Sequence, residues 1–280
     1  MLLARSPILV SIMVGLNDVS QRARSTCLCR AERKKLRSSI SDAATRPPVD
    51  FSAAIEMPIR AELFSVERLE QHGESLAAAQ TIAKKRRAGR PLAGRLRENG
   101  RVLLKAYRAM AEATRAHDPI TPAAEWLVDN FHVVEAQIRE IKDDLPPSFY
   151  RQLPKLADGP LEGFPRVFGL AWAFVAHTDS RFDAEMLCRF VAAYQRIQPL
   201  TIGELWAIAI TLRIVLVENL RRLAERIVDR RLSRREADSL ADRLLGSEGS
   251  KAEPIEAVLK RLSEKPSWLA LFSRPFGLFW

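Results

Sequence analysis

The segment from Thr201 to Arg230 limits the possible folds more than any other part of the chain. Within it, the run Leu205–Val217 is apolar on nearly every side of a helix and is interrupted by Arg213. A helix that is apolar all round is either the centre of a helical domain or a membrane span. A span needs roughly 20 apolar residues, whereas Glu204 and Glu218 bracket a shorter run here. The segment therefore predicts a buried central helix, followed by an amphipathic half whose apolar stripe is Leu220, Leu223, Ala224 and Ile227.

The other periodic segments also favour helices. Apolar residues recur at helical spacing from about Ala61, from Pro91, from Pro122, after Pro165 and after Asp183, and again over Ile255–Leu262. Gly73 weakens the first of these helices. No segment alternates apolar and polar residues over the length of a strand. The predicted fold class is therefore all-α, a multi-helix bundle around the buried central helix.

Start signals place the ends of several helices. An N-cap is predicted at Thr121, before Pro122, and another at Asp183. Thr201 and Glu204 form a capping box for the central helix. The same device recurs at Ser233 and Glu236, where we expect a new helix that ends at Gly246.

Two aromatic residues lie on segments that we expect to face the core. Phe131 belongs to an amphipathic helix with four-three spacing of Leu127, Phe131, Val134, Ile138 and Ile141. Trp206 lies in the apolar run of the central helix. Residues 146–165 are rich in proline but also in aromatic and aliphatic side chains. They predict an ordered crossing that packs against the helices, with a docking surface as the alternative.

These patterns divide the chain into three parts. Residues 1–57 are basic and lack sustained periodicity, which predicts a disordered tail. Their apolar start is not followed by the cleavage site of a signal peptide. Residues 58–265 are predicted to form the helical module, and residues 266–280 an irregular aromatic tail.

The chain is basic, with 44 lysines and arginines against 34 acidic residues. Such a surplus is typical of proteins that bind nucleic acid or anionic lipid, and also of ordinary solvated surfaces. Residues 84–108 concentrate this charge, because ten of them are basic and only Glu98 is acidic. The stretch is either an electrostatic clamp on phosphates or lipid head groups, or a basic linker and helix with solvated charges. The second interpretation is favoured.

The residues themselves predict no catalytic, cofactor-binding or metal-binding site. The sequence lacks glycine-rich nucleotide motifs, His-Glu-x-x-His and Gly-x-Ser-x-Gly. Cys27-x-Cys29 has no second pair nearby, and three cysteines form no disulfide framework, which is typical of a reducing compartment. The histidines are dispersed, at His72, His117, His132 and His177.

A few charged residues could serve either structure or function. Asp143 and Asp144 are expected to face water or to pair with a nearby arginine. Arg213, Glu218 and Asn219 lie in or beside the buried segment, where an unpaired charge costs several kcal/mol. We favour a structural buried network over a ligand site for these three residues.

The strings EWLVDNF, LPKLADGP and PLTIGELWA resemble bacterial cyclic β-1,2-glucan synthases, in the region that precedes their first membrane spans. The resemblance extends over roughly Pro58–Leu262. It implies a large inner-membrane enzyme that polymerises glucose from UDP-glucose into β-1,2-linked chains and then cyclises them. The family's Asp-x-Asp and Gln-x-x-Arg-Trp signatures are missing from this chain, so no catalytic role is carried over to any residue.

The resemblance implies an N-terminal, non-catalytic helical fragment of such a synthase, with no cofactor of its own. Its expected partners are the transferase and membrane segments of the synthase and an anionic membrane surface, at the cytoplasmic face of the bacterial inner membrane. Because residues 1–57 and 266–280 do not resemble the family, we expect a truncated or frame-shifted reading of a longer gene. The alternative is an independent basic helical protein that binds nucleic acid or anionic membrane through residues 84–108.

Overall fold

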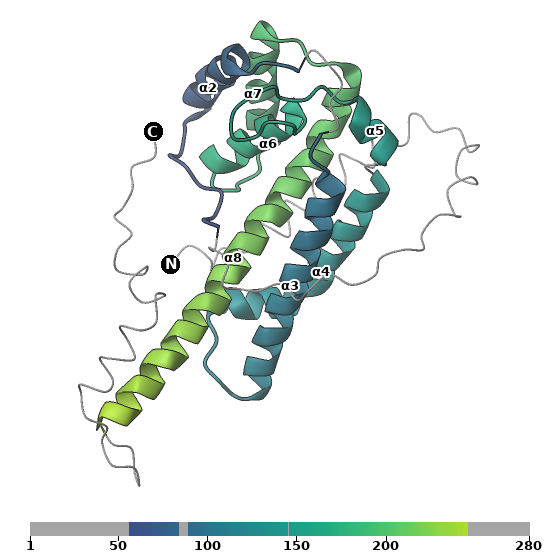
Figure 1. The fold of residues 1–280 in the computed structure, drawn as a ribbon. Helices are drawn as coiled ribbons and strands as arrows, with labels where there is room; N and C mark the ends of the chain where they lie inside the picture. The colour runs from purple at the N-terminus through teal and green to yellow at the C-terminus, as the bar shows by residue number, and fades with distance from the viewer. Residues whose placement is uncertain (1–55, 84–88, 145, 246–280) are drawn as a thin grey trace, which may run out of the picture. The chain divides into compact units, whose positions relative to one another are not determined.

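The computed structural model describes residues 56–83, 89–144 and 146–245. These residues form helices joined by short connections (Figure 1), namely α2 (Val66–Ala79), α3 (Leu92–Arg115), α4 (Pro122–Asp144), α5 (Pro147–Gln152), α6 (Arg166–His177), α7 (Ala184–Ile197) and α8 (Ile202–Leu245). Extended pairing within the described ranges is limited to two isolated bridges, Ile82 with Leu156 and Lys155 with Pro165. The predicted all-α fold class is confirmed.

Several predicted features lie outside the described residues. They are the tail before Glu56, the basic residues 84–88, Gly246, the helix over Ile255–Leu262 and the aromatic tail 266–280. The chain divides into a compact unit that ends at Ile227 and a second unit that begins at Val228. We call the described residues of the first, 56–227, the helical unit.

Helix α8 runs through the centre of the helical unit, as predicted. Every residue from Thr211 to Leu220 is buried. Side chains of α3, α4 and α6 reach this stretch, and the three helices lie around it in Figure 1. An apolar helix covered in this way removes all of its side chains from water, which is the dominant favourable term in folding.

The first turns of α8 differ from the prediction. Trp206 is 57% exposed and Leu205 is 38% exposed, whereas the side that faces the unit carries Glu204, Ala207 and Ile208. The prediction that Trp206 faces the core is therefore wrong. In a continuous apolar run, no polar residue marks the outer face, so periodicity alone does not reveal which side is covered.

Helix α8 also extends through Ser233 to Leu245. The predicted helix start at Ser233 and Glu236 is therefore wrong. No glycine or proline lies between Glu204 and Leu245, so nothing in the sequence forces the helix to break. Neither α8 nor any other helix in the described ranges combines the length and hydropathy needed to cross a membrane.

Around α8, helix α2 packs against α7, and α3 packs against α4. Gly73 suits the first pair, because a Cβ atom there would lie 3.0 Å from the carbonyl oxygen of Phe190. In the second pair, Tyr107 of α3 stacks on Phe131 of α4 with ring centroids 4.4 Å apart. Phe131 is half-buried and faces α3, on a helix that packs within the unit as expected.

Helix starts are confirmed at three predicted positions, Thr121, Asp183 and Thr201. The Asp183 side chain accepts a hydrogen bond from the backbone N–H of Met186 at 2.9 Å. At α8, Thr201 Oγ1 accepts from the N–H of Glu204 at 3.3 Å, and the Glu204 carboxylate accepts from the N–H of Thr201 at 2.9 Å. This reciprocal pair is the predicted capping box.

Residues 146–165 form the ordered crossing that the sequence predicts. Helix α5 is followed by a turn in which Gly159 and Gly163 adopt φ angles of 78° and 80°, which glycine reaches without steric cost. The Tyr150 hydroxyl donates to the carbonyl oxygen of Arg90 at 2.5 Å, which ties the crossing to the start of α3. Its buried apolar side chains include Leu153, Leu156 and Phe164.

Candidate functional site

Among the side chains of α8 that the structure describes, three charged ones are completely buried, those of Glu204, Arg213 and Glu218. Each binds side chains of a different neighbouring helix. Because a buried charge is costly unless it is paired and hydrogen-bonded, these three positions are the natural candidates for a functional site. The partners of each residue decide what the site can do.

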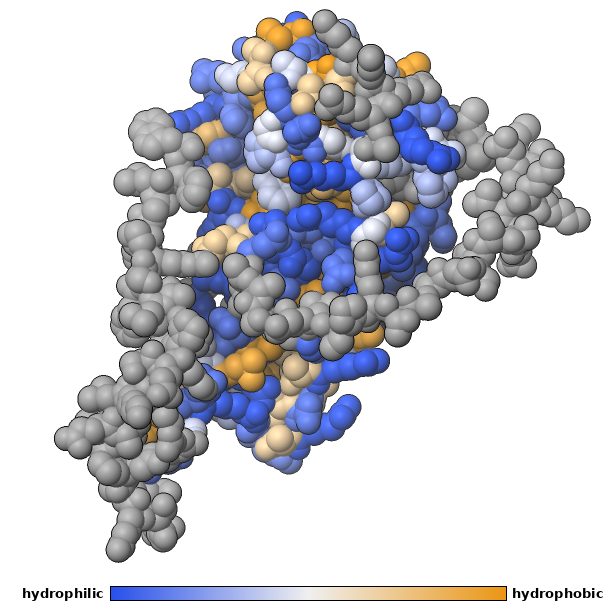
Figure 2. Space-filling model, in the orientation of Figure 1, coloured by the Kyte–Doolittle hydropathy of each residue, from blue (hydrophilic) through white to orange (hydrophobic). Residues whose placement is uncertain are grey.

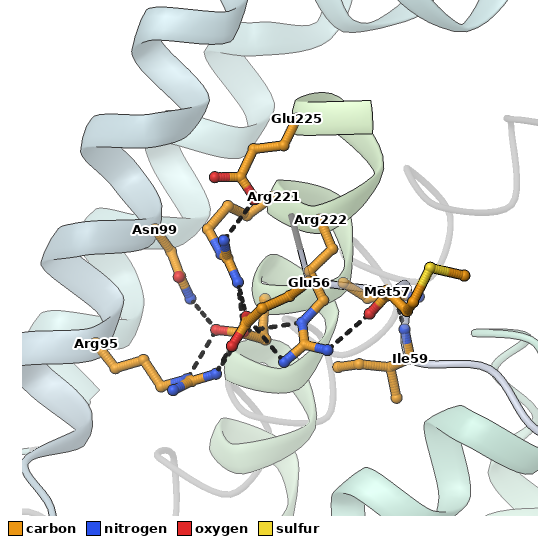
Figure 3. Close-up of polar contacts among 10 residues, drawn as sticks. Glu56, Met57, Ile59, Arg95, Asn99, Arg221, Arg222 and Glu225 are labelled. Atoms are coloured by element: carbon orange, nitrogen blue, oxygen red, sulfur yellow. Dashed lines mark hydrogen bonds and ion pairs between the residues drawn. The ribbon is translucent and has the colours of Figure 1, made fainter. Parts of the chain in front are cut away.

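Glu218 is held by a cluster of donors from α3 and from its own helix, and Figure 3 labels the donors Arg95, Asn99, Arg221 and Arg222. Arg95 donates two hydrogen bonds to its carboxylate, at 2.9 and 2.6 Å, and Asn99 donates one at 2.7 Å. Arg221 and Arg222, one turn farther along α8, donate at 2.9 and 3.1 Å. A carboxylate with this many charge-assisted bonds is fixed in position and in its ionised state.

Two more carboxylates complete this cluster. Glu225 accepts from Arg221 at 2.6 Å, and Glu56 pairs with Arg222 at 3.1 Å. Glu56 also pairs with Arg221 and, at 3.8 Å, with Arg95. The cluster thus joins the arginines Arg95, Arg221 and Arg222 with the glutamates Glu56, Glu218 and Glu225. Since the two sets are equal in number, their formal charges cancel.

The pKa of Glu218 reflects this environment. Burial acts to raise the pKa of its carboxyl, but the hydrogen bonds and charges of Arg95 and Arg221 outweigh burial and lower the pKa from 4.5 to about 2. A carboxylate with so low a pKa holds a proton poorly at neutral pH, so it is a weak general base. Its geometry and pKa both suit a structural role.

Asn219, beside this cluster, binds the segment that precedes α2. Its side-chain oxygen accepts from the backbone N–H of Ile59 at 2.7 Å, and its side-chain nitrogen donates to Ser180 Oγ at 2.8 Å. Arg222 donates to the carbonyl oxygen of Met57 at 2.7 Å, and its guanidinium lies 5.0 Å from the ring centre of Trp172. The segment before α2 is therefore attached to the centre of the unit.

Arg213 binds three side chains of α4. Its guanidinium donates to Gln137 at 3.0 Å, to Glu140 at 2.8 Å and to Asp144 at 3.2 Å. The pairing predicted for the Asp143–Asp144 pair with a nearby arginine is confirmed for Asp144. Arg213 thus connects α8 to the last turns of α4.

Glu204 binds the start of α6. Arg166 donates to both of its carboxylate oxygens, at 2.5 and 2.7 Å, and also to Gln198 and to the carbonyl oxygen of Pro199. The same carboxylate accepts the capping hydrogen bond from Thr201. Glu204 therefore caps α8 and holds α6 at the same time. As predicted, the charges in and beside the buried segment have protein partners.

The structure brings together two of the four histidines. His177 stacks on Phe64 with ring centroids 3.9 Å apart, and His72 meets His177 edge-on at 4.6 Å. Burial, and then the charge of His177, lowers the pKa of His72. His132 is exposed on α4, and Cys188 is an exposed free thiol. Over the described ranges, no three histidine, cysteine or acidic side chains gather as a metal site would require.

The basic stretch 84–108 is divided among several roles. Arg95 is part of the Glu218 cluster, and Arg101 pairs with Glu98 at 2.5 Å. The guanidinium of Arg90 lies 5.5 Å from the ring centre of Phe164. Fewer of these charges are available to a polyanion than the sequence indicates.

Sequence reasoning missed the partners Arg95, Asn99 and Arg166. One signal was present: Asn99 falls between Leu96 and Leu103, on the apolar stripe of α3, and is buried. A polar residue on such a stripe needs a buried partner. Arg166 gives no signal of this kind, because only the packing of α6 against α8 brings it to Glu204.

No protein-family model matches the chain. Over 188 residues, or 67% of the chain, it is 45% identical to the cyclic beta-(1,2)-glucan synthase NdvB of Rhizobium meliloti (strain 1021). The chain spans 7% of the length of that relative. The predicted resemblance is confirmed, and the identity relates this chain to the cyclic β-1,2-glucan synthase family.

Proposed function

We propose that this chain is a non-catalytic helical part of a cyclic β-1,2-glucan synthase, and that it supports the transferase of that enzyme. The observation that carries the proposal is the 45% identity over 188 residues, in a chain that spans 7% of the relative. A segment of this size is too small a share of the synthase to represent all of its activities. It is large enough to be one folded unit.

The buried ion pairs support a structural task. Glu204, Arg213 and Glu218 tie α8 to α6, α4 and α3, and each uses protein side chains as partners. The carboxylate of Glu218, with its pKa near 2, is suited to holding arginines in place rather than to moving protons. A unit fastened in this way can present a fixed surface to its partners.

The partners follow from the same proposal. The helical unit contacts the transferase and the membrane segments of the synthase, at the cytoplasmic face of the bacterial inner membrane. The basic surface of the chain is attracted to the anionic lipids of that leaflet, where each lysine or arginine close to the surface contributes about 1 kcal/mol.

A segment exchange in the Rhizobium meliloti synthase tests the supporting role. Deletion of its matching 188-residue segment should abolish cyclic glucan production, and replacement by the corresponding residues of this chain should restore it. A replacement that carries Arg213→Ala should give less folded synthase, because it removes the ion pairs of Arg213 with Glu140 and Asp144. Unchanged glucan production after the deletion would contradict the proposal.

An assay of the chain alone tests its lack of catalysis. The 280-residue protein, incubated with radiolabelled UDP-glucose and a divalent metal, should incorporate no label into polymer. Label that appears in glucan, or covalently on the protein, would show that this chain has transferase activity of its own.

A further inference from the structure

Large hydrophobic side chains that remain exposed gather at one end of the helical unit. The described residues include eight such side chains, and five of them, Ile82, Ile197, Ile202, Leu205 and Trp206, belong to the neighbouring ends of α2, α7 and α8. We call these five residues the apolar corner. Single exposed hydrophobic residues need no explanation, but a contiguous group often marks an interaction site.

The elements of the apolar corner are joined by direct contacts. The side chain of Gln198, after α7, donates to the carbonyl oxygen of Gln80, at the end of α2, at 2.9 Å. Gly203, in the first turn of α8, lies against the ring of Phe149 in α5, since a Cβ atom there would be 3.6 Å from that ring. The ends of α2, α7 and α8 that carry the exposed residues are therefore neighbours at one end of the unit. Figure 2 shows hydrophobic side chains at the upper end of the view, where α7 ends and α8 begins.

The start of α8 has an unusual distribution of polarity. Ile202, Leu205 and Trp206 lie on the outer side of the helix and are 75%, 38% and 57% exposed. Glu204, the only acidic residue in the first two turns, points inward and is paired with Arg166. The outer side of these turns is thus apolar and carries no negative charge.

Two exposed basic residues belong to elements that reach this end of the unit, because Arg151 is in α5, whose Phe149 lies against Gly203 of α8, and Arg90 is bound by Tyr150 of α5. Arg90 and Arg151 are exposed, and neither forms an ion pair with a described residue. They are close to each other, because Tyr150, next to Arg151, donates a hydrogen bond to the backbone of Arg90. In the sequence, Ala83 is followed by four basic residues that lie outside the described ranges and that we do not count in this surface.

We propose that the apolar corner inserts into the interfacial region of an anionic lipid bilayer. Tryptophan side chains favour the boundary between head groups and acyl chains, and isoleucine and leucine favour the acyl region below it. Arg90 and Arg151 then lie at the level of the lipid phosphates, to which they are attracted. The inference rests on the proposed membrane association and names the surface that makes the contact.

Vesicle binding by the full 280-residue chain tests this surface. We expect the protein to co-sediment with vesicles of phosphatidylcholine and phosphatidylglycerol at near-physiological salt, and to bind pure phosphatidylcholine less. The double substitution Ile202→Glu and Trp206→Glu should weaken binding about tenfold or more, because it removes two apolar anchors and adds negative charge.

Leu63→Glu is the control. Leu63 is 60% exposed, as Trp206 is 57% exposed, so the control places one carboxylate at an accessible apolar position, where the double substitution places two. The backbone N–H of its neighbour Phe64 donates to the carbonyl oxygen of His177, the last residue of α6. The apolar corner lies near Arg166, at the other end of that helix. The control should bind vesicles as the unchanged protein does. Circular dichroism and denaturant melts should show that all variants remain folded.

Fluorescence locates the contact independently of affinity. Lipids with a nitroxide group near the head group should quench part of the tryptophan emission of the unchanged protein. Trp206→Phe should keep most of the binding, because phenylalanine is also apolar, but should lose that quenching. A change of fold would lower vesicle binding and quenching together, so it would not give binding without quenching.

Three outcomes would overturn the proposal: undiminished binding by the Ile202→Glu and Trp206→Glu variant, an equal loss with Leu63→Glu, or no vesicle binding by the unchanged chain. If the chain instead forms dimers that the double substitution dissolves, the occupant of the corner is a second copy. Because this assay involves no glucan synthesis, its failure would leave the segment-exchange test of the proposed function unaffected.

Discussion

At the scale of single residues, α8 buries charged side chains completely while it exposes a large apolar side chain. Glu204, Arg213 and Glu218 are fully buried, while Trp206, on the same helix, is largely exposed. Each of the three charges is paired, and removal of one partner from a buried ion pair usually costs 3–5 kcal/mol. The residues whose substitution most lowers the stability of the fold therefore include charged ones.

Alanine substitutions should show this order. Trp206→Ala should lower the free energy of unfolding by less than about 1 kcal/mol, because surface substitutions have small effects. Phe174→Ala should cost about 3–5 kcal/mol, since Phe174 is 2% exposed and packs near Phe190. Urea melts of the two variants give both values. A loss of several kcal/mol for Trp206→Ala would place its side chain in the core after all.

Glu218 should contribute a pH-dependent part of the stability. Its pKa in the folded protein is about 2, below the ordinary value of 4.5, so its contribution is complete above pH 4.5 and is lost as the pH falls toward 2. At neutral pH, Glu218→Gln should cost about 3–5 kcal/mol, because three arginines lose their shared carboxylate.

Melts of both proteins between pH 7 and pH 2 measure this effect. The difference in unfolding free energy between the unchanged protein and Glu218→Gln should shrink as the pH falls. Glu135→Gln is the control, since Glu135 is an exposed partner of Arg139 at 3.5 Å and should contribute about 0.5 kcal/mol at most. A difference that does not depend on pH would mean that the pKa of Glu218 is the same in the folded and the unfolded protein.

At the scale of elements, contacts between helices determine the role of each sequence signal. Gly73 weakens α2 as an isolated helix, but it allows α2 to approach the backbone of α7. Ser233 and Glu236 have the spacing of a capping box, yet they lie inside α8. The true box at Thr201 follows Pro199, and Leu200 beside it is buried, so the chain turns there. The same local pattern therefore has different outcomes in different surroundings.

Two glycine substitutions separate helix propensity from packing. Gly73→Ala should destabilise the protein, because the new Cβ would lie 3.0 Å from the backbone oxygen of Phe190. Gly100→Ala should stabilise it by about 0.5–1 kcal/mol, because the new Cβ would lie 3.5 Å from Ile138, an ordinary contact. Thermal and urea melts compare them. Equal stabilisation by both would show that α2 and α7 can separate at no cost.

At the scale of the whole chain, internal ion pairs leave the net charge of +10 unchanged, because they neutralise equal numbers of basic and acidic residues, but they keep individual arginines from binding a polyanion. Arg95, Arg166 and Arg213 are consumed by internal ion pairs. The exposed basic residues of the described ranges are spread over several helices and include Arg68 in α2, Arg139 in α4 and Arg189 in α7. A surface of this kind attracts polyanions weakly and without a defined geometry.

DNA binding should therefore be weak and independent of sequence. Its affinity should fall with salt by a log–log slope of about 0.9 for each phosphate neutralised. Alanine at Lys84, Lys85, Arg86 and Arg87 should reduce both the affinity and the slope, because it removes four of the ten basic residues of the stretch. Fluorescence titrations over a salt series measure both quantities. Tight, sequence-selective binding would instead favour an independent nucleic-acid-binding protein.

The sequence by itself determined the helical class, the central helix and most helix starts. These features depend on local periodicity and on capping residues a few positions apart, such as Thr201 with Glu204. The sequence strings also pointed to the glucan synthases, because such strings are specific over many residues. The need for partners at Arg213 and Glu218 followed from burial alone.

Only the tertiary structure decided which partners these charges have and which side of α8 is covered. Arg166 meets Glu204, and Arg95 meets Glu218, through contacts between helices that are distant in sequence. The exposure of Trp206 has the same origin: an apolar run can be buried on any side, and only the positions of the surrounding helices select one. Long-range packing, which no local pattern encodes, thus decides both the buried network and the apolar corner.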